Sequence, residues 1–173
     1  MPNPVRAWRR RPRRAAQQRR PPTGTEECLI MSVYYEVVFA CFLRDETPEE
    51  SLDALRWHLG QLADRPASLM PEDDPDRLLC PNPASRLPGG DIASLSRQLR
   101  RTADGQEVHA WGLFSRTLCP DENLSELATI MALLAANVAD DGYGGYYRDV
   151  DAAEATAFAF TAATSDQGDE PGS

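Results

Sequence analysis

The sequence predicts a single α+β domain, in which two helices cover one face of an antiparallel sheet. Segments rich in β-branched and aromatic residues alternate along the chain with two segments in which leucines recur every three or four residues. The length of 173 residues fits one domain of ordinary size, which buries a sufficient core without disulfides or a structural metal. We place this domain at residues 31–163, between an arginine-rich segment at 1–30 and a polar tail at 164–173, and expect both flanking segments to be disordered.

The first strand is predicted over residues 32–43, and the first helix is predicted from Thr47 onward. Alternate positions of the strand are almost wholly apolar, and they are Val33, Tyr35, Val37, Phe39, Cys41 and Leu43. The other positions include Tyr34 and Glu36, so we expect a central strand with one face less covered than the other. Thr47 is the expected N-cap of the helix, with Pro48 at its first position. Four leucines then recur on one helix face, at Leu52, Leu55, Leu59 and Leu62.

A proline-rich segment and a hairpin follow the first helix. Residues 64–91 contain six prolines and an acidic run, which predicts a long loop. Residues 92–102 and 107–118 have the composition of strands, and Asp104 and Gly105 between them are typical turn residues. The sequence therefore predicts a β-hairpin at these positions.

The second helix is predicted from Asp121 to about Ala139, and two strands are predicted after it, at 143–150 and 155–161. The helix has one apolar stripe, formed by Leu124, Leu127, Ile130, Met131, Leu134 and Val138. Glycines 142, 144 and 145 come after a helix and before a strand, which is the wrong order for a phosphate-binding loop. We expect Gly142 to end the helix, and Gly144 or Gly145 to form a bulge or a close backbone approach.

The resulting order, βαββαβ with an extra C-terminal strand, resembles the ferredoxin-like split βαβ arrangement. The resemblance is one of topology, it covers about residues 32–162, and it includes no family motif. It implies an antiparallel sheet with both helices on one face. Because such sheets support many unrelated functions, the resemblance implies no particular activity.

Charge is distributed unequally between the two parts of the chain. The net charge is −9, yet eight of the 18 arginines lie in the first thirty positions, and from Met31 onward ten arginines oppose 25 acidic residues. So acidic a domain repels phosphate backbones, which leaves nucleic acid as a partner only through the arginine-rich segment. That segment is either a basic arm for anionic partners or an upstream extension of a gene whose true start is Met31, and we favour the second interpretation.

Composition also indicates a source and a compartment. Abundant Ala, Arg, Asp, Gly and Pro with no lysine is typical of a GC-rich coding sequence, so we expect a bacterial protein. The four cysteines are widely spaced, without a CxxC pair or a secretory signal, which favours free thiols in the cytoplasm. Apolar stretches are shorter than the roughly 20 residues that cross a bilayer, so no membrane association is expected.

Few residues are candidates for chemistry near neutral pH. His58 lies beside the leucine stripe of the first helix, where a packing role is expected. His109 has the same parity as Trp111 in its strand. We favour a solvated or edge-strand position for this histidine, and the alternative is that it shares with Trp111 the sheet face that the helices leave open. The residues predicted to line a ligand pocket on that face are Tyr34, Glu36, His109, Trp111 and Tyr146. The sequence identifies no catalytic residue.

No cofactor or metal is predicted, because the cysteines and histidines lack ligand spacing and the acidic run 72–76 lacks the pattern of a calcium loop. Because the titratable residues needed for catalysis are few and the surface is strongly acidic, we expect a non-catalytic protein-interaction or regulatory module, which binds a protein partner or a second copy of itself. The alternative is a small-molecule-binding or enzymatic homodimer whose pocket lies on the open sheet face.

Overall fold

The computed structural model describes residues 33–69 and 77–162. The two segments predicted to be disordered, 1–30 and 164–173, lie outside the described residues, as does the acidic run 72–76. The described residues form a five-stranded antiparallel sheet and two α-helices, which confirms the predicted α+β class. No helix among these residues is long and apolar enough to cross a membrane.

The sheet is built around the first strand of the chain. Its strands are β1 (Tyr34–Arg44), β2 (Ile92–Arg101), β3 (Glu107–Pro120), β4 (Gly142–Asp149) and β5 (Thr156–Phe160). They lie in the order β2-β3-β1-β4-β5, and each neighbouring pair is antiparallel. The apolar strand β1 is therefore central, as its composition predicts, because neighbouring strands on both sides shield its side chains from water.

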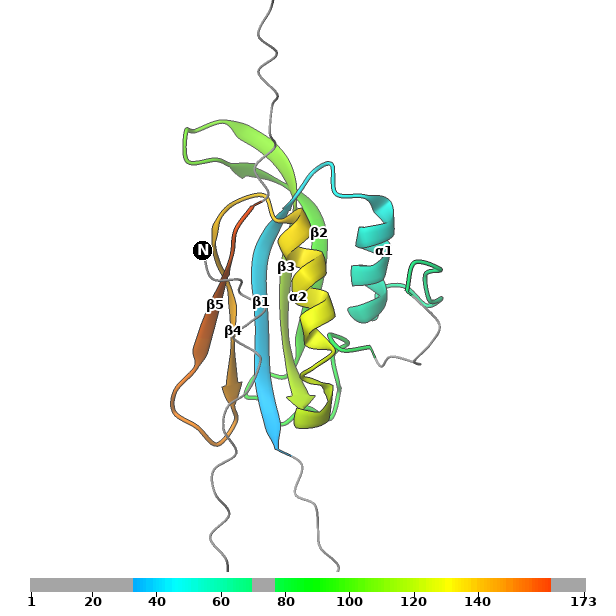
Figure 1. Cartoon of the computed structure of the whole chain (residues 1–173), viewed down its shortest axis with the longest axis vertical. Helices are drawn as coiled ribbons and strands as arrows, with labels where there is room; N and C mark the ends of the chain where they lie inside the picture. Colours follow the sequence, from blue (N-terminus) through cyan, green and yellow to red (C-terminus); the bar gives the residue numbers. More distant parts are fainter. Residues whose placement is uncertain (1–32, 70–76, 163–173) are drawn as a thin grey trace, which may run out of the picture.

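Both helices pack on the same face of the sheet, α1 (Glu49–His58) beside β2 and α2 (Leu127–Asn137) in front of β1 and β3 (Figure 1). The core lies between them and the sheet, and its most buried members include Val37, Phe39, Leu43, Leu52, Leu55, Leu127, Ile130 and Leu134. These residues belong to the apolar positions of β1 and to the two predicted helix stripes. Hydrophobic periodicity thus predicted which side of β1 and of the two helices is buried.

The helix ends differ from their prediction. Pro48, and not Thr47, is the N-cap of α1, and the Thr47 hydroxyl donates instead to the carbonyl of Arg44 at 2.6 Å. The helix ends at His58, two residues before Gly60, whose φ of +75° suits a residue without a Cβ atom. Leu62 therefore lies outside the helix.

The second helix also begins later than predicted. Residues Asp121–Asn123 form a short 3₁₀ turn, and α2 starts only at Leu127. The prediction that Gly142 ends this helix is wrong, because α2 ends at Asn137 and Val138 then forms a β-bridge with Leu43. The helix thus passes directly into a contact with the central strand.

The predicted bulge is present in β4. The pairing of β4 with β5 shifts register between Tyr143 and Gly145. Gly145 has a φ of +144°, and a Cβ atom placed on it would lie 1.9 Å from the carbonyl oxygen of Val38. A glycine is required here because β4 approaches the backbone of β1 too closely for any side chain.

Candidate functional site

The face of the sheet that the helices leave uncovered is called the open face below. Paired residues of an antiparallel sheet project from the same face, so the even-numbered residues of β1 identify their neighbours across the sheet. Val38 pairs with Arg116 of β3 and with Tyr146 of β4, and Arg116 in turn pairs with Ile92 of β2. The open face thus comprises Glu36, Val38, Ala40, Phe42, Ile92, Ser94, Phe114, Arg116, Tyr146 and Arg148.

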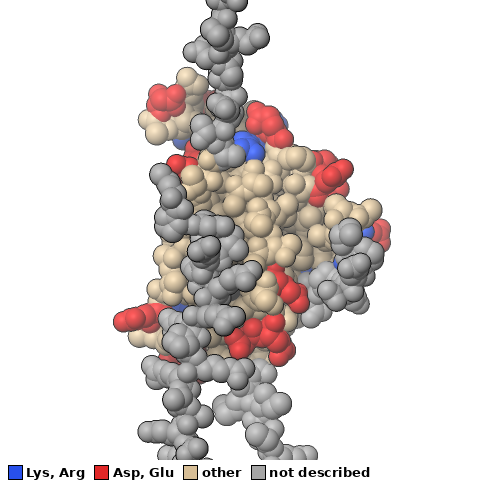
Figure 2. Space-filling model, in the orientation of Figure 1, with Lys and Arg blue, Asp and Glu red and all other residues tan. Residues whose placement is uncertain are grey.

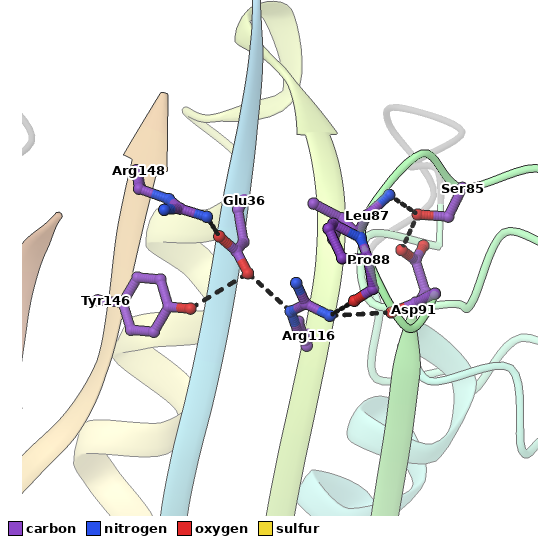
Figure 3. Close-up of polar contacts among 9 residues, drawn as sticks. Glu36, Ser85, Leu87, Pro88, Asp91, Arg116, Tyr146 and Arg148 are labelled. Carbon is purple, nitrogen blue, oxygen red and sulfur yellow. Dashed lines mark hydrogen bonds and ion pairs between the residues drawn. The ribbon is translucent and has the colours of Figure 1, made fainter. Parts of the chain in front are cut away.

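Glu36 is the most unusual residue of the open face. Its side chain is only 1% exposed, although it projects away from the helices. Arg116 Nε donates to Oε1 at 2.7 Å, Tyr146 Oη donates to the same oxygen at 3.1 Å, and Arg148 Nη2 donates to Oε2. Figure 3 shows these three side chains converging on Glu36 from the two strands that flank β1.

This arrangement keeps the carboxylate ionised. Burial alone would raise the pKa of Glu36, but the hydrogen bonds from Arg116, Arg148 and Tyr146 together lower it below its usual value. The pKa of Tyr146 is raised, first by burial and then by the adjacent carboxylate. A carboxylate with three donors and a lowered pKa is a poor proton carrier near neutral pH, so its role in the structure is to hold three strands together.

Arg116 also connects this cluster to the loop before β2. Its Nη1 atom donates to the carbonyl oxygens of Pro88, at 2.6 Å, and Gly90, at 3.3 Å. The same loop is closed by Asp91, which accepts a hydrogen bond from the Ser85 hydroxyl (Figure 3) and another from the backbone amide of Asn82 at 3.0 Å. The buried carboxylate therefore positions a loop as well as a sheet.

Sequence reasoning missed both arginines. The signal that points to them is an acidic residue within an apolar strand, because a carboxylate buried there needs a positively charged partner on a neighbouring strand. Arg116 and Arg148 are the arginines of the two strands paired with β1, and the pairing places both beside Glu36.

A groove of about 510 Å³ lies on the open face toward the other end of β1. Its lining includes Ala40, Phe42, Ser94, Ser96, Gln98, Gly112, Phe114, Asp140, Asp141 and Tyr143. Three of the aromatic side chains here are well exposed, Phe42 at 37%, Phe114 at 40% and Tyr143 at 58%. On one side Arg100 forms an ion pair with Asp140 and stacks over the Phe42 ring, 4.7 Å from its centroid. The groove thus has apolar walls and an acidic rim.

The structure separates the five residues predicted to form a pocket. Tyr34, Glu36 and Tyr146 project from the open face, whereas Trp111 pairs with the core residue Leu43 and therefore projects from the opposite face. His109 has the same parity in β3 and follows Trp111 to that face. The expectation that all five share the open face is wrong, and none of the five lines the groove.

Trp111 instead packs beside the first helix, where the guanidinium of Arg56 lies 5.2 Å from the centroid of its ring. Sequence parity shows that His109 and Trp111 project together. It does not show which face of the sheet they reach, because that depends on the register between β3 and β1.

His58 has the packing role expected of it. It is 4% exposed, its ring lies edge-on to that of Trp57 at 4.8 Å, and its Nδ1 atom has no hydrogen-bond partner among the described residues. Burial, aided by the positive charge of Arg65, lowers the pKa of His58 to about 4. The imidazole is therefore neutral in the folded protein at neutral pH.

His58 should make the folded state sensitive to mild acid. An unfolded chain protonates this residue near pH 6.5, whereas the folded chain resists protonation until about pH 4, so stability is complete above pH 6.5 and falls as the pH is lowered toward 4. We expect the free energy of unfolding to fall by about 2 kcal/mol between pH 7 and pH 5. Urea denaturation at pH 7 and at pH 5 measures this change in the free energy of unfolding.

The variants His58→Leu and His109→Leu separate this effect from other titrations. The first is expected to abolish most of the difference between pH 7 and pH 5, and the second, at an exposed position of β3, to preserve it. An unchanged difference in His58→Leu would assign the acid sensitivity to other groups.

The thiols and possible metal ligands are dispersed. Cys41, Cys80 and Cys119 are free, and burial raises the pKa of Cys41 and of Cys119 to about 12, so neither is a reactive thiolate. Within residues 33–69 and 77–162, no group of three or more His, Cys, Asp or Glu side chains is placed to hold a metal ion.

Comparisons with known proteins add no functional information to this geometry. No protein-family model matches the chain, and the searches of curated proteins and of solved structures found no match either.

Proposed function

We propose that this chain is a non-catalytic protein-interaction module whose contact surface is the open face. The observation that supports it most directly is the exposure of large apolar side chains on one side of a sheet. Phe42, Phe114, Ile92 and Tyr143 are each 37–58% exposed there, close to a groove. Clustered exposed apolar side chains are typical of binding surfaces, because their burial against a partner removes apolar area from water.

The two buried titratable groups discussed above, Glu36 and His58, also favour binding over catalysis. The carboxylate of Glu36 already has three donors, and His58 is buried and neutral. Neither group is both accessible and poised to exchange a proton near pH 7. This supports a module that recognises a partner by shape and apolar contact.

A small-molecule site is the second candidate, and the groove is the observation that favours it. Its volume of about 510 Å³ is within the range of ligand pockets, and serines 94 and 96 with Gln98 supply polar groups among aromatic walls. The groove is open along the sheet, which suits a segment of another protein better than an enclosed ligand.

We also infer a ferredoxin-like arrangement and a cytoplasmic location for this module. The order in which β1 lies between β3 and β4, with β2 at one edge, supports the ferredoxin-like assignment, and β5 is then the extra strand. Free cysteines without a CxxC pair support a reducing compartment.

Cysteine footprinting tests whether the open face is occupied. The variant Ser94→Cys places a thiol on the groove wall, and peptide mass spectrometry reads its maleimide labelling separately from that of the native cysteines. We expect labelling to be slower in extracts of cells that contain the protein at its native level than in dilute purified protein. The matched control Thr129→Cys, on the outer face of α2, should label at the same rate in both. If position 94 labels at the same rate in the extract and at every dilution of the purified protein, the proposed function is contradicted.

A further inference from the structure

We propose that the open face binds a second copy of this chain, in a two-fold contact that packs the two sheets face to face. This inference rests on the proposed function, since it names the partner of the same surface. In such a contact the same patch serves both copies, so the patch must be compatible with itself in charge and in shape.

Charge restricts where two copies can meet. The chain is acidic overall, with a net charge of −9. Figure 2 shows the helix-covered side of the molecule, where acidic groups outnumber basic ones around an uncharged centre. Two copies of such a protein repel one another over surfaces of this kind, because like charges brought together lose solvation without gaining a partner.

The open face has a balance of charge that the chain as a whole lacks. At the end of the open face where β1 begins, Arg116 and Arg148 surround the carboxylate of Glu36, and we call this the first end. The other end carries two acids, Asp140 and Asp141, against Arg100, which pairs with Asp140. Among the charged side chains that strand pairing or the groove lining places on the open face, the first end thus has one positive charge in excess and the other end has one negative charge in excess.

Arg44, at the end of β1, adds no positive charge to the open face. Arg44 reaches the helix-covered side, where its Nη2 atom donates to the carbonyl of Ala136 at 2.7 Å, in the last turn of α2. Its charge is thus directed at the negative end of that helix.

The positions of the two charged ends define the orientation of the pair. Asp141 immediately precedes β4 and Arg148 lies near its end, so about 20–25 Å of strand separates them. A two-fold axis in the plane between the sheets and perpendicular to β4 reverses the strand direction of the second copy. This places the arginine end of each sheet over the acidic end of the other, and it makes the two sets of charges complementary.

The apolar groups lie between the two ends. Phe114 and Phe42 border the groove from neighbouring strands, with Ala40 and Gly112 as small residues beside them. Protruding aromatic rings and a groove on one patch are what a two-fold contact needs, since each copy can insert its rings against the groove of the other. Face-to-face sheets of this kind pack about 10 Å apart, a distance that such rings fill.

Photo-crosslinking identifies the occupant. We would incorporate p-benzoylphenylalanine in place of Phe114 in the full chain, irradiate living cells, and measure the mass of the products. The expected product has twice the 19.1 kDa mass of the chain. Purified protein mixed from ¹⁴N- and ¹⁵N-labelled batches should give mixed-label pairs, with the attachment point on the open face of the other copy. The same photo-reactive residue at Thr129, on the outer face of α2, is the control and should give no such pair.

The other outcomes overturn the inference in distinguishable ways. A product of another mass would assign the open face to a different protein, which contradicts the second copy and leaves the proposed function standing. A crosslink within one chain would mean that the chain covers its own face. No product, together with equal footprinting rates at position 94, would overturn both proposals.

Sedimentation velocity over a concentration series provides a second, independent test. Phe114→Asp is expected to weaken the dimer roughly 100-fold or more, because a two-fold contact suffers the lost ring and the added charge twice. Leu99→Asp is the matched control, since Leu99 is 57% exposed but pairs with His109 and so projects from the opposite face. Equal behaviour of the two variants, or a monomer at every concentration of the unaltered chain, would overturn the inference.

Discussion

Replacement of Glu36 with glutamine is expected to lower the free energy of unfolding by about 3 kcal/mol, because two partly buried guanidinium groups lose their counter-ion. Glutamine keeps the size of the side chain but cannot accept hydrogen bonds at both ends, so Arg148 loses its carboxylate partner and Arg116 retains the carbonyls of Pro88 and Gly90. Urea denaturation monitored by circular dichroism measures the change as a lower transition midpoint at an unchanged slope.

Glu107→Gln is the matched control for this prediction. Glu107 pairs with Arg101 across 3.2 Å, but both side chains are more than half exposed, so the same substitution is expected to change stability by less than about 1 kcal/mol. Equal losses in the two variants would show that the buried cluster contributes no more than a surface pair.

The cluster also has a pH dependence of its own, at lower pH than that of His58. The pKa of Glu36 is lowered in the folded protein, so the stability it contributes is present above its usual pKa of 4.5 and is lost as the pH falls through the lower folded value. Glu36→Gln is expected to remove this loss below pH 4.5 and to leave the change between pH 7 and pH 5 in place.

Replacement of Gly145 with alanine is expected to cost about 4 kcal/mol, from backbone strain together with forced separation of β1 and β4. The residue has a φ of +144°, and its added Cβ atom would lie 1.9 Å from the carbonyl oxygen of Val38 and 2.8 Å from the ring of Phe158. The carbonyl belongs to the central strand and cannot move without breaking the sheet. Thermal or urea unfolding of the variant measures the loss.

Gly142→Ala separates the two contributions. Gly142 has a similar φ of +133°, yet no atom lies within 4 Å of the position its Cβ atom would take. Only the backbone strain remains there, so the expected loss is about 1 to 2 kcal/mol. If the two alanine variants were equally stable, the close approach to Val38 would not be what requires a glycine at position 145.

The elements of this protein follow from local patterns in its sequence. Alternating apolar residues predicted β1 and its buried side, leucine repeats predicted the buried stripes of both helices, and glycines 144 and 145 predicted a bulge. Each of these signals depends on residues only a few positions apart, because the side-chain periods of strands and helices are properties of the local backbone. The helix ends were less predictable, since the Thr47 hydroxyl had the Arg44 carbonyl as an alternative partner.

The site was decided by contacts between distant parts of the chain. Arg116 and Arg148 lie 80 and 112 positions after Glu36 in the sequence, and only the registers of β1 with β3 and with β4 bring them together. The same registers send Trp111 to the helix-covered face and leave Phe114 on the open face. Strand alternation predicts which residues of one strand project together, whereas a shift of one residue between strands reverses the face that they reach. The sequence alone therefore determined the elements and the buried sides of β1 and the two helices, and only the tertiary structure decided which face the residues of β3 reach and which side chains meet.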